Sequence, residues 1–219
     1  MEHEVKSKRR YNSSRRRAQA RETRRAIIEA ARRLFLERGY TGATIEAIAH
    51  EAGVAVDTVY GAFGSKWGVL QRLIEVSVVG DDEPIPLLDR AGPAEVRAEK
   101  DPRRQIELFA IGIRQVLVRS EPVYTIMRSA AATEPDLVPL LSNLQTQRLA
   151  GMVDFVAGVA ANVPLRDGIS QADAAETVWT LASPEVYRLL TVDRNWPLDR
   201  YESWLGTTLN AVLLPDAKE

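Results

Sequence analysis

The sequence predicts an all-α fold in which a small N-terminal three-helix domain is followed by a larger helical domain. Apolar residues recur at the spacing of an amphipathic helix along most of the chain, and no useful stretch alternates as a strand does. A segment rich in glycine, proline and acids, residues 80–102, separates the first helices from the later ones. With 45% hydrophobic and 27% charged residues, the 219-residue chain should fold.

The composition excludes several kinds of site. The chain has no cysteine, so it can form no disulfide, thiolate metal site or thiol nucleophile. Its two histidines, His3 and His50, belong to no metal-ligand spacing, and we expect neither a metal nor another cofactor. The apolar runs are far shorter than the ~20 residues of a membrane span, and no signal-peptide core follows the basic N-terminus. We expect no membrane partner and a cytoplasmic location.

Charge is unevenly distributed along the chain, although the net charge is only -1. Basic residues outnumber acids in residues 1–75, and acids outnumber basic residues in the remainder. A nucleic-acid-binding end attached to a non-binding body would produce this asymmetry, because phosphate contacts need cations on one surface only. A merely basic, solvated tail is the alternative explanation.

Residues 1–20 form the most basic segment and contain almost no apolar side chain. Such a segment cannot bury a face, and we expect a disordered basic arm. Arginines on a flexible arm can enter the minor groove of DNA beside a helix in the major groove. Arg15, Arg16 and Arg17 are therefore candidate DNA contacts.

Residues 21–64 are expected to form the three-helix domain. The first helix ends at Gly39 as a C-cap, and the second begins after Thr44, whose hydroxyl can cap free backbone N–H groups. Gly53 stops the second helix, and a short third helix ends near Gly64.

Residues 44–63 have the layout of a helix-turn-helix, in which one set of side chains fixes the helices and another faces outward. The inward set is Ile45, Ile48, Ala49, Val54, Val59 and Phe63. The outward set is Ala55, Val56, Asp57, Thr58, Tyr60, Gly61 and Ala62. These short, mixed side chains suit close approach to base edges.

Residues 22–75 resemble the DNA-binding domain of the TetR family of transcriptional repressors. The resemblance rests on an arginine-flanked apolar first helix, the Gly-Tyr step at 39–40, T-x-x-x-I-A-x-x-A-G-V at 44–54, and T-V-Y-x-x-F-x-S-K at 58–66. It implies a homodimeric repressor on a palindromic operator of double-stranded DNA, released when a small-molecule effector of unknown identity enters the C-terminal domain.

The resemblance also implies roles for single residues. Tyr60 and Lys66 match phosphate-contacting positions, and Thr58 faces the major groove; Tyr60 could otherwise be a partly buried core aromatic. An acid near DNA is repelled unless it accepts a hydrogen bond from a cytosine N4 or caps the third helix, and of these two roles we expect Asp57 to take the cap. The DNA-binding candidates are Arg15, Arg16, Arg17, Thr44, Ala55, Val56, Asp57, Thr58, Tyr60, Gly61 and Lys66.

The chain departs from the family pattern at four positions of the third helix. Ala55 and Val56 stand where the family often has serine and lysine, and Gly61 and Ala62 replace a polar and an aromatic residue. The recognition surface is therefore small and uncharged, and we expect the basic arm to contribute more to binding.

Residues 65–219 are expected to form a helical regulatory and dimerisation domain. The predicted helices are 65–80, 103–119, 122–132, 135–161, 170–192 with a break at Pro184, and 198–214. Two long apolar-faced helices at the end of a chain suit a symmetric four-helix dimer interface. Its candidate residues, some of which must instead be core, are Val178, Leu181, Trp204, Leu205, Leu209 and Val212.

A ligand cavity would lie between the fourth helix and those spanning 103–161. Its candidate lining is Phe109, Tyr124, Met127, Arg128 and Phe155, any of which could simply be core. Arg128, set among small apolar residues, could bind an acidic ligand or pair with Glu121 or Glu134.

Two other classes of function compete with a DNA-binding regulator. An α-helical enzyme with a basic nucleic-acid-binding face lacks the chemistry it would need, so we expect no enzyme. A ligand-independent architectural DNA-binding protein is compatible with the sequence, although the acidic body is large for a protein with no sensing task.

Overall fold

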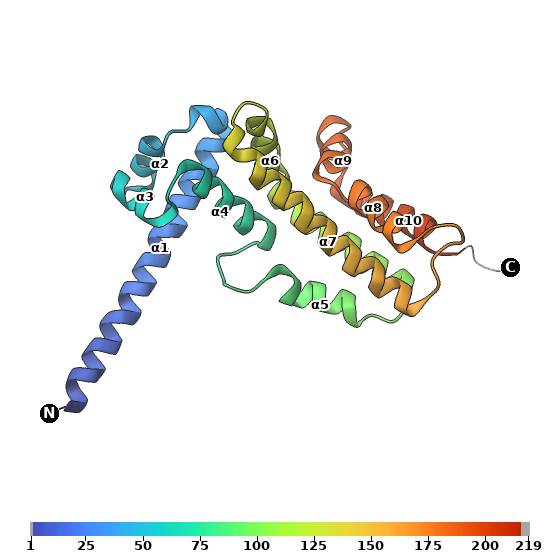
Figure 1. The fold of residues 1–219 in the computed structure, drawn as a ribbon, viewed down its shortest axis with the longest axis horizontal. Helices are drawn as coiled ribbons and strands as arrows, with labels where there is room; N and C mark the ends of the chain where they lie inside the picture. Colours follow the sequence, from blue (N-terminus) through green and yellow to red (C-terminus); the bar gives the residue numbers. More distant parts are fainter. Residues whose placement is uncertain (1, 216–219) are drawn as a thin grey trace. The chain divides into compact units, whose positions relative to one another are not determined.

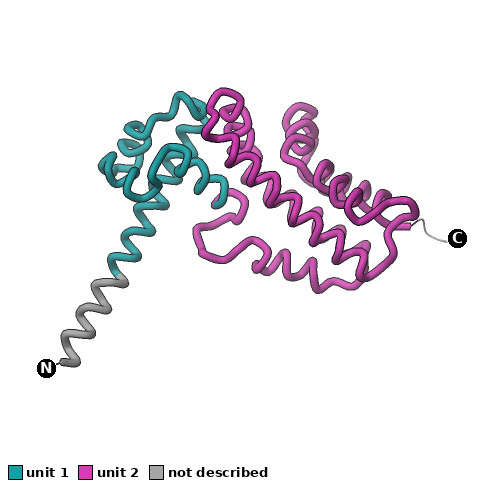
Figure 2. Tube along the Cα trace, in the orientation of Figure 1, with its two compact units in different colours: residues 1–75 teal, residues 76–219 magenta. Residues whose placement is uncertain are grey.

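The computed structural model describes the backbone of residues 2–215 and the side chains from residue 15 onwards. This described part is built from helices and contains no β-strand (Figure 1). It divides into two compact units, residues 1–75 and 76–219 (Figure 2). None of the helices in residues 2–215 is long and apolar enough to cross a bilayer.

The division between the units falls inside a helix, between Glu75 and Val76. The sequence predicts a boundary after Gly64 instead. The difference arises because the apolar face of this helix, Val69 to Ile74, lies before the division and is almost fully buried. The helices of the first unit are α1 (Glu2–Gly42), α2 (Ile45–Ala52), α3 (Val56–Phe63) and most of α4 (Lys66–Val79).

The backbone of α1 breaks at Gly39, where φ is 68° and ψ is 178°. This combination is essentially restricted to glycine, because a Cβ atom would clash with the neighbouring backbone. The long straight part of α1 therefore ends where the sequence predicts a C-cap.

The N-terminal segment differs from the disordered arm expected for residues 1–20, because α1 extends back to Glu2. Arginine, alanine and glutamine are good helix formers, and lengthening an existing helix avoids the cost of nucleation. The side chains of residues 15–20 are all exposed, as expected of a segment with no apolar face. Residue 1 and the side chains of residues 2–14 lie outside the described part.

The second unit is assembled around two long helices, α6 and α7. α7 packs along α8, and α6 packs along α10 (Figure 1). The elements of this unit are η1 (Leu87–Asp89), α5 (Ala91–Ala98), α6 (Pro102–Ala131), η2 (Pro135–Leu137), α7 (Val138–Asn162), α8 (Gln171–Leu181), α9 (Pro184–Arg188), η3 (Leu189–Asp193) and α10 (Leu198–Leu213). Ser183 caps α9 by accepting a hydrogen bond from the Val186 N–H at 3.1 Å, so the predicted break at Pro184 is confirmed.

Helix α6 is continuous through Pro122, and the predicted break between residues 119 and 122 is wrong. A proline inside a helix removes one backbone hydrogen bond and normally kinks or ends it. Here the buried residues on either side, Leu117, Val123 and Met127, keep one face of α6 against the core. Tertiary burial outweighs the local defect.

Candidate DNA-binding interface and regulatory sites

Helices α2 and α3 form a helix-turn-helix whose ends are set by local hydrogen bonds. The Thr44 hydroxyl accepts a hydrogen bond from the Ala47 N–H at 3.1 Å, which caps α2 as predicted. Hydrogen bonds from its own backbone N–H and from Thr44 lower the pKa of Glu46. Gly53, with φ 66° and ψ 35°, ends α2 in a left-handed conformation, and its N–H donates to the His50 carbonyl at 3.1 Å.

The predicted inward face of the motif is largely confirmed. Ile45, Ile48, Ala49 and Val59 are 5% exposed or less, whereas Val54 and Phe63 are half-buried. α2 packs on α1 and on α3. Buried apolar contacts therefore hold α3 in a defined orientation within the first unit.

The opposite face of α3 is open to solvent. Asp57, Thr58 and Gly61 are exposed, together with Ala55 just before the helix, and Val56 is half-buried. The side chain of Tyr60 is 46% exposed, so the alternative of a buried core aromatic is wrong. A large exposed aromatic with a hydroxyl at its tip is suited to a polar partner outside the chain.

Asp57 does not take the capping role expected for it. It lies in the first turn of α3, but Ala55 is the N-cap residue, and no hydrogen bond to the Asp57 carboxylate is found in residues 15–215. The carboxylate still lies near the positive end of the short helix dipole, which favours an acid there.

Lys66 is tied to its own domain. Its Nζ donates to the Tyr40 carbonyl at 2.9 Å and lies 4.2 Å from the centre of the Tyr40 ring. Both contacts offset the unfavourable placement of a cation at the start of α4, which Ser65 caps through the Gly68 N–H at 3.1 Å. The lysine therefore joins the last turn of α1, just after the break at Gly39, to the start of α4, a role the sequence did not reveal.

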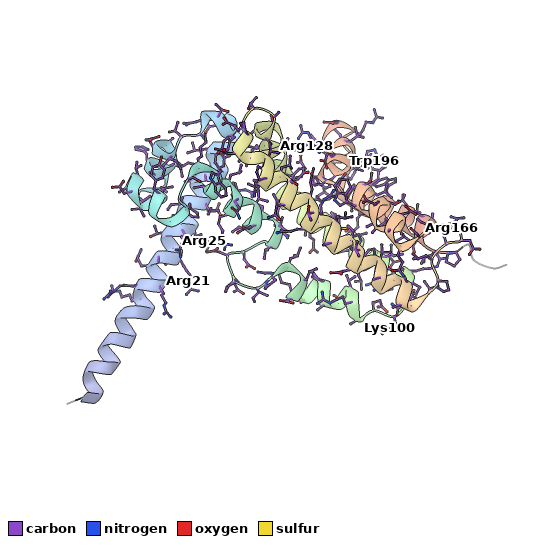
Figure 3. All side chains as sticks on the ribbon, in the orientation of Figure 1. Arg21, Arg25, Lys100, Arg128, Arg166 and Trp196 are labelled. Atoms are coloured by element: carbon purple, nitrogen blue, oxygen red, sulfur yellow. The ribbon has the colours of Figure 1, made fainter. Side chains whose placement is uncertain are left out.

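Two further features of the first unit bear on DNA binding. The described arginines at the N-terminal end of α1, including Arg15 to Arg17, Arg21 and Arg25, are exposed, and Figure 3 shows Arg21 and Arg25 projecting from the helix. Trp67, beside Lys66, is 44% exposed. Sequence reasoning did not single out Trp67; an aromatic in the first turn of a helix that follows the recognition helix was the available signal.

The second unit contains a cavity of about 600 Å³. Phe109 and Phe155 line it and stack on each other, with ring centres 3.8 Å apart and an interplanar angle of 13°. The other predicted pocket residues are elsewhere: Met127 is fully buried in the core and lines neither this cavity nor the hollow beside Tyr124.

Tyr124 and Arg128 line a separate hollow of about 340 Å³. Arg128 forms an ion pair with Glu185, rather than with the Glu121 or Glu134 that the sequence suggests. The Tyr124 hydroxyl donates to the same Glu185 carboxylate at 3.3 Å. Figure 3 shows Arg128 on α6, whereas Glu185 belongs to α9, a pairing of residues distant in sequence.

The predicted dimer residues divide into two groups. Val178, Leu205 and Leu209 are fully buried in the core of their own unit and cannot reach a partner, so these three predictions are wrong. Leu181 and Trp204 are partly buried against that core, and Val212 is half-buried. Exposed apolar side chains lie nearby in sequence at Leu189, Val192 and Leu198, and others lie elsewhere in the unit, as at Val138 and Val153.

Comparison with protein families places the first unit in a known group. The family model described as bacterial regulatory proteins, tetR family, matches residues 27–73. The chain is 29% identical over 163 residues to the HTH-type transcriptional repressor BepR of Brucella suis biovar 1 (strain 1330), covering 73% of this chain and 75% of that protein. A shorter match, 44% identical over 57 residues, links it to the uncharacterized HTH-type transcriptional regulator TtgW of Pseudomonas putida; it covers 26% of this chain and 42% of that protein.

Solved structures share the fold of both units. NalD, the secondary repressor of the MexAB-OprM multidrug efflux pump in Pseudomonas aeruginosa, aligns with a TM-score of 0.65 and 20% identity over 90% of this chain and 99% of that one. The transcriptional regulator FadR from Bacillus subtilis, solved in complex with stearoyl-CoA, aligns with a TM-score of 0.67 and 16% identity over 84% and 96% of the two chains. Together with the capped helix-turn-helix and its exposed recognition face, these matches show that residues 27–73 form a helix-turn-helix domain of the tetR family type and that the chain is similar to transcriptional regulators of that family.

Proposed function

We propose that this chain is a transcriptional repressor that binds a palindromic operator as a homodimer and leaves it when a small molecule occupies the second unit. The exposed face of α3 is the observation that carries the proposal. Thr58 and Tyr60 point to solvent while Val59 between them is fully buried. A helix held in this way can enter the major groove and present its outer residues to base edges.

The arginines of α1 would contact phosphates rather than the minor groove. An α-helix with its side chains is about 10–12 Å across, whereas the minor groove of B-DNA is about 6 Å wide. A helical segment carrying Arg15 to Arg17 therefore fits against the sugar-phosphate backbone of the duplex, where its contacts do not depend on the base sequence. This role replaces the flexible minor-groove arm that the sequence suggests.

Dimerisation is supported by apolar side chains that the second unit leaves uncovered. Leu189, Val192 and Leu198 are exposed by 54%, 44% and 39%; the first two lie in η3, directly after α9, and Leu198 is the first residue of α10. An isologous interface uses the same surface on both subunits, so it would bury these side chains on each of the two subunits. We propose that they supplement Leu181, Trp204 and Val212 at the interface.

Ligand sensing is supported by the cavity beside Phe109 and Phe155. Its volume of about 600 Å³ falls within the common range for small-molecule sites, roughly 300–1,000 Å³. Two neighbours in fold, the stearoyl-CoA complex of FadR and the efflux-pump repressor NalD, are regulators of the same architecture.

Selection of binding sites from a random duplex pool by the full-length protein tests the proposal. We expect enrichment of a palindromic motif, to which Thr58→Ala and Tyr60→Ala bind at least tenfold more weakly. Thr146→Ala, the same change at an exposed position of the second unit, should bind like the wild type. Absence of any enriched motif would favour a nonspecific architectural protein.

Sedimentation of the same protein tests the dimer. Leu189→Glu and Val192→Glu should shift the protein toward monomer, whereas Val138→Glu, at an exposed valine of α7, should not. A dimer that is unchanged in the first two variants would contradict the proposed interface.

A further inference from the structure

The wall of the 600 Å³ cavity is apolar over much of its extent but includes one arginine of α6. Phe109, Val96 and Ile113 are among the apolar lining residues. Gly112 and Gly151 also line the cavity, and a Cβ atom added to either would meet no other atom within 4 Å. The helices thus present bare backbone to the cavity, which leaves room for an elongated or planar apolar ligand.

Arg119 joins this cavity to the end of α4. It lines the cavity, and its Nε donates to the Ser77 carbonyl at 3.2 Å while its Nη2 donates to the Val78 carbonyl at 3.1 Å. These carbonyls belong to the last turn of α4, where a helix has no intrahelical donors to offer. Arg119 therefore caps the C-terminus of α4.

The backbone that follows is shaped to accept this guanidinium. Gly80 has φ +101°, and a Cβ atom placed there would lie 3.3 Å from both Nε and Cζ of Arg119. Partial burial lowers the pKa of Arg119, so its charge is held where it is less well hydrated than at an open surface. Asp81, the next residue, is held in bidentate fashion by Arg90 at 2.5 and 2.7 Å.

We propose that Arg119 recognises the anionic group of an apolar acid in this cavity and, in doing so, releases the last turn of α4. The inference rests on the proposed ligand sensing and specifies its chemistry. A carboxylate accepts hydrogen bonds from a guanidinium more strongly than a neutral carbonyl does, and it engages two N–H groups at once. The ligand would therefore compete for the N–H groups that now cap α4.

The consequence reaches the first unit through the chain itself. The boundary between the units, Glu75–Val76, lies inside α4, one residue before the first carbonyl that Arg119 holds. Loss of this cap frays the helix at the point where it leaves the first unit. Ligand binding in the cavity is thereby coupled to the helix that carries the DNA-binding unit.

Matched pairs of ligands on the full-length protein test this inference. Dodecanoate is compared with 1-dodecanol, and 2-naphthylacetate with 2-(2-naphthyl)ethanol, by thermal shift and by amide hydrogen exchange. We expect at least one acid to bind tenfold or more tightly than its alcohol and to speed exchange in peptides covering residues 74–80. Arg119→Met should abolish the preference, and Arg119→Lys should retain part of it. Arg103→Met, at an exposed arginine of the same helix, should leave it unchanged.

Equal binding of acids and alcohols, no binding of either acid, or an unchanged preference in Arg119→Met would overturn the role of Arg119. Neither assay uses DNA, so these results are separate from operator selection. If a palindromic motif is enriched but acid and alcohol bind equally, the proposed repressor function is retained and only the proposed role of Arg119 is rejected. Circular dichroism of Arg119→Met checks that the variant is folded.

Discussion

Replacing three glycines of the first unit by alanine measures how much the backbone conformation at each position contributes to the stability of that unit. Apart from the glycine's own backbone and its two chain neighbours, a Cβ atom added at Gly39, Gly53 or Gly61 would meet no atom within 4 Å, so none of the three substitutions introduces a clash with a packed side chain. They differ in backbone conformation. Gly39 has φ 68° and ψ 178°, Gly53 has φ 66° and ψ 35°, and Gly61 lies within α3.

The expected changes in stability follow from these angles. Gly39→Ala places a side chain in a region almost confined to glycine and should destabilise the first unit by about 1–3 kcal/mol. Gly53→Ala enters the left-handed helical region and should cost about 1–2 kcal/mol. Gly61→Ala removes glycine from a helix interior and should stabilise the unit by about 1 kcal/mol. The order of stability is therefore Gly61→Ala, wild type, Gly53→Ala, Gly39→Ala.

Hydrogen exchange measured by mass spectrometry on the full-length protein is the suitable assay, because peptides from residues 27–63 report the first unit separately. Thermal unfolding supplies a second measure, in which 1 kcal/mol shifts the midpoint by about 4–8 °C for a unit of this size. A Gly39→Ala variant as stable as the wild type would contradict the backbone break in α1 at Gly39. A destabilised Gly61→Ala would show that α3 does not continue through residue 61.

Four other predictions concern the caps, core and charges. Thr44→Ala should destabilise the first unit by about 1 kcal/mol in urea denaturation while Thr44→Ser does not, because only the hydroxyl caps α2; equal losses would exclude the cap. Tyr201 is fully buried, and its hydroxyl has no hydrogen-bond partner among the described residues, so Tyr201→Phe should leave stability unchanged or raise it by about 1 kcal/mol; a clear loss would reveal a partner. The Arg90 guanidinium lowers the pKa of Asp81 to about 2, so this pair stabilises the loop fully above the ordinary pKa of 3.8 and ceases to do so as pH falls through about 2. Arg90→Gln should return the pKa of Asp81 to its ordinary value in an NMR titration. An ordinary pKa of Asp81 in the wild type would contradict the pairing. Replacing Arg15, Arg16 and Arg17 by glutamine should make the slope of log K against log salt for operator binding shallower by up to about 0.9 for each phosphate that the protein no longer neutralises, without changing the preferred motif. An unchanged slope would mean that this part of α1 does not touch DNA. A changed motif would favour base readout by these arginines.

The helix-turn-helix could be predicted from the sequence alone, because the signals that define it act within one or two helical turns. A threonine hydroxyl reaches an N–H three residues ahead, Gly53 adopts an angle that other residues avoid, and Ile45, Ile48 and Ala49 share a face by helical periodicity alone. The chemistry of the outward face followed from the same periodicity. Exposure of Tyr60 needed the structure, since an aromatic on a short helix is compatible with either face.

The partner that an apolar or charged side chain contacts could be identified only in the folded chain. Val178, Leu205 and Leu209 belong to amphipathic helices that could face a core or a second subunit, and only packing placed them in the core. Arg128 pairs with a glutamate of α9, which is distant in sequence, and Arg119 donates to carbonyls in the last turn of α4. Periodicity specifies a face but not its neighbour, because the choice between neighbours depends on burial and packing summed over elements distant in sequence.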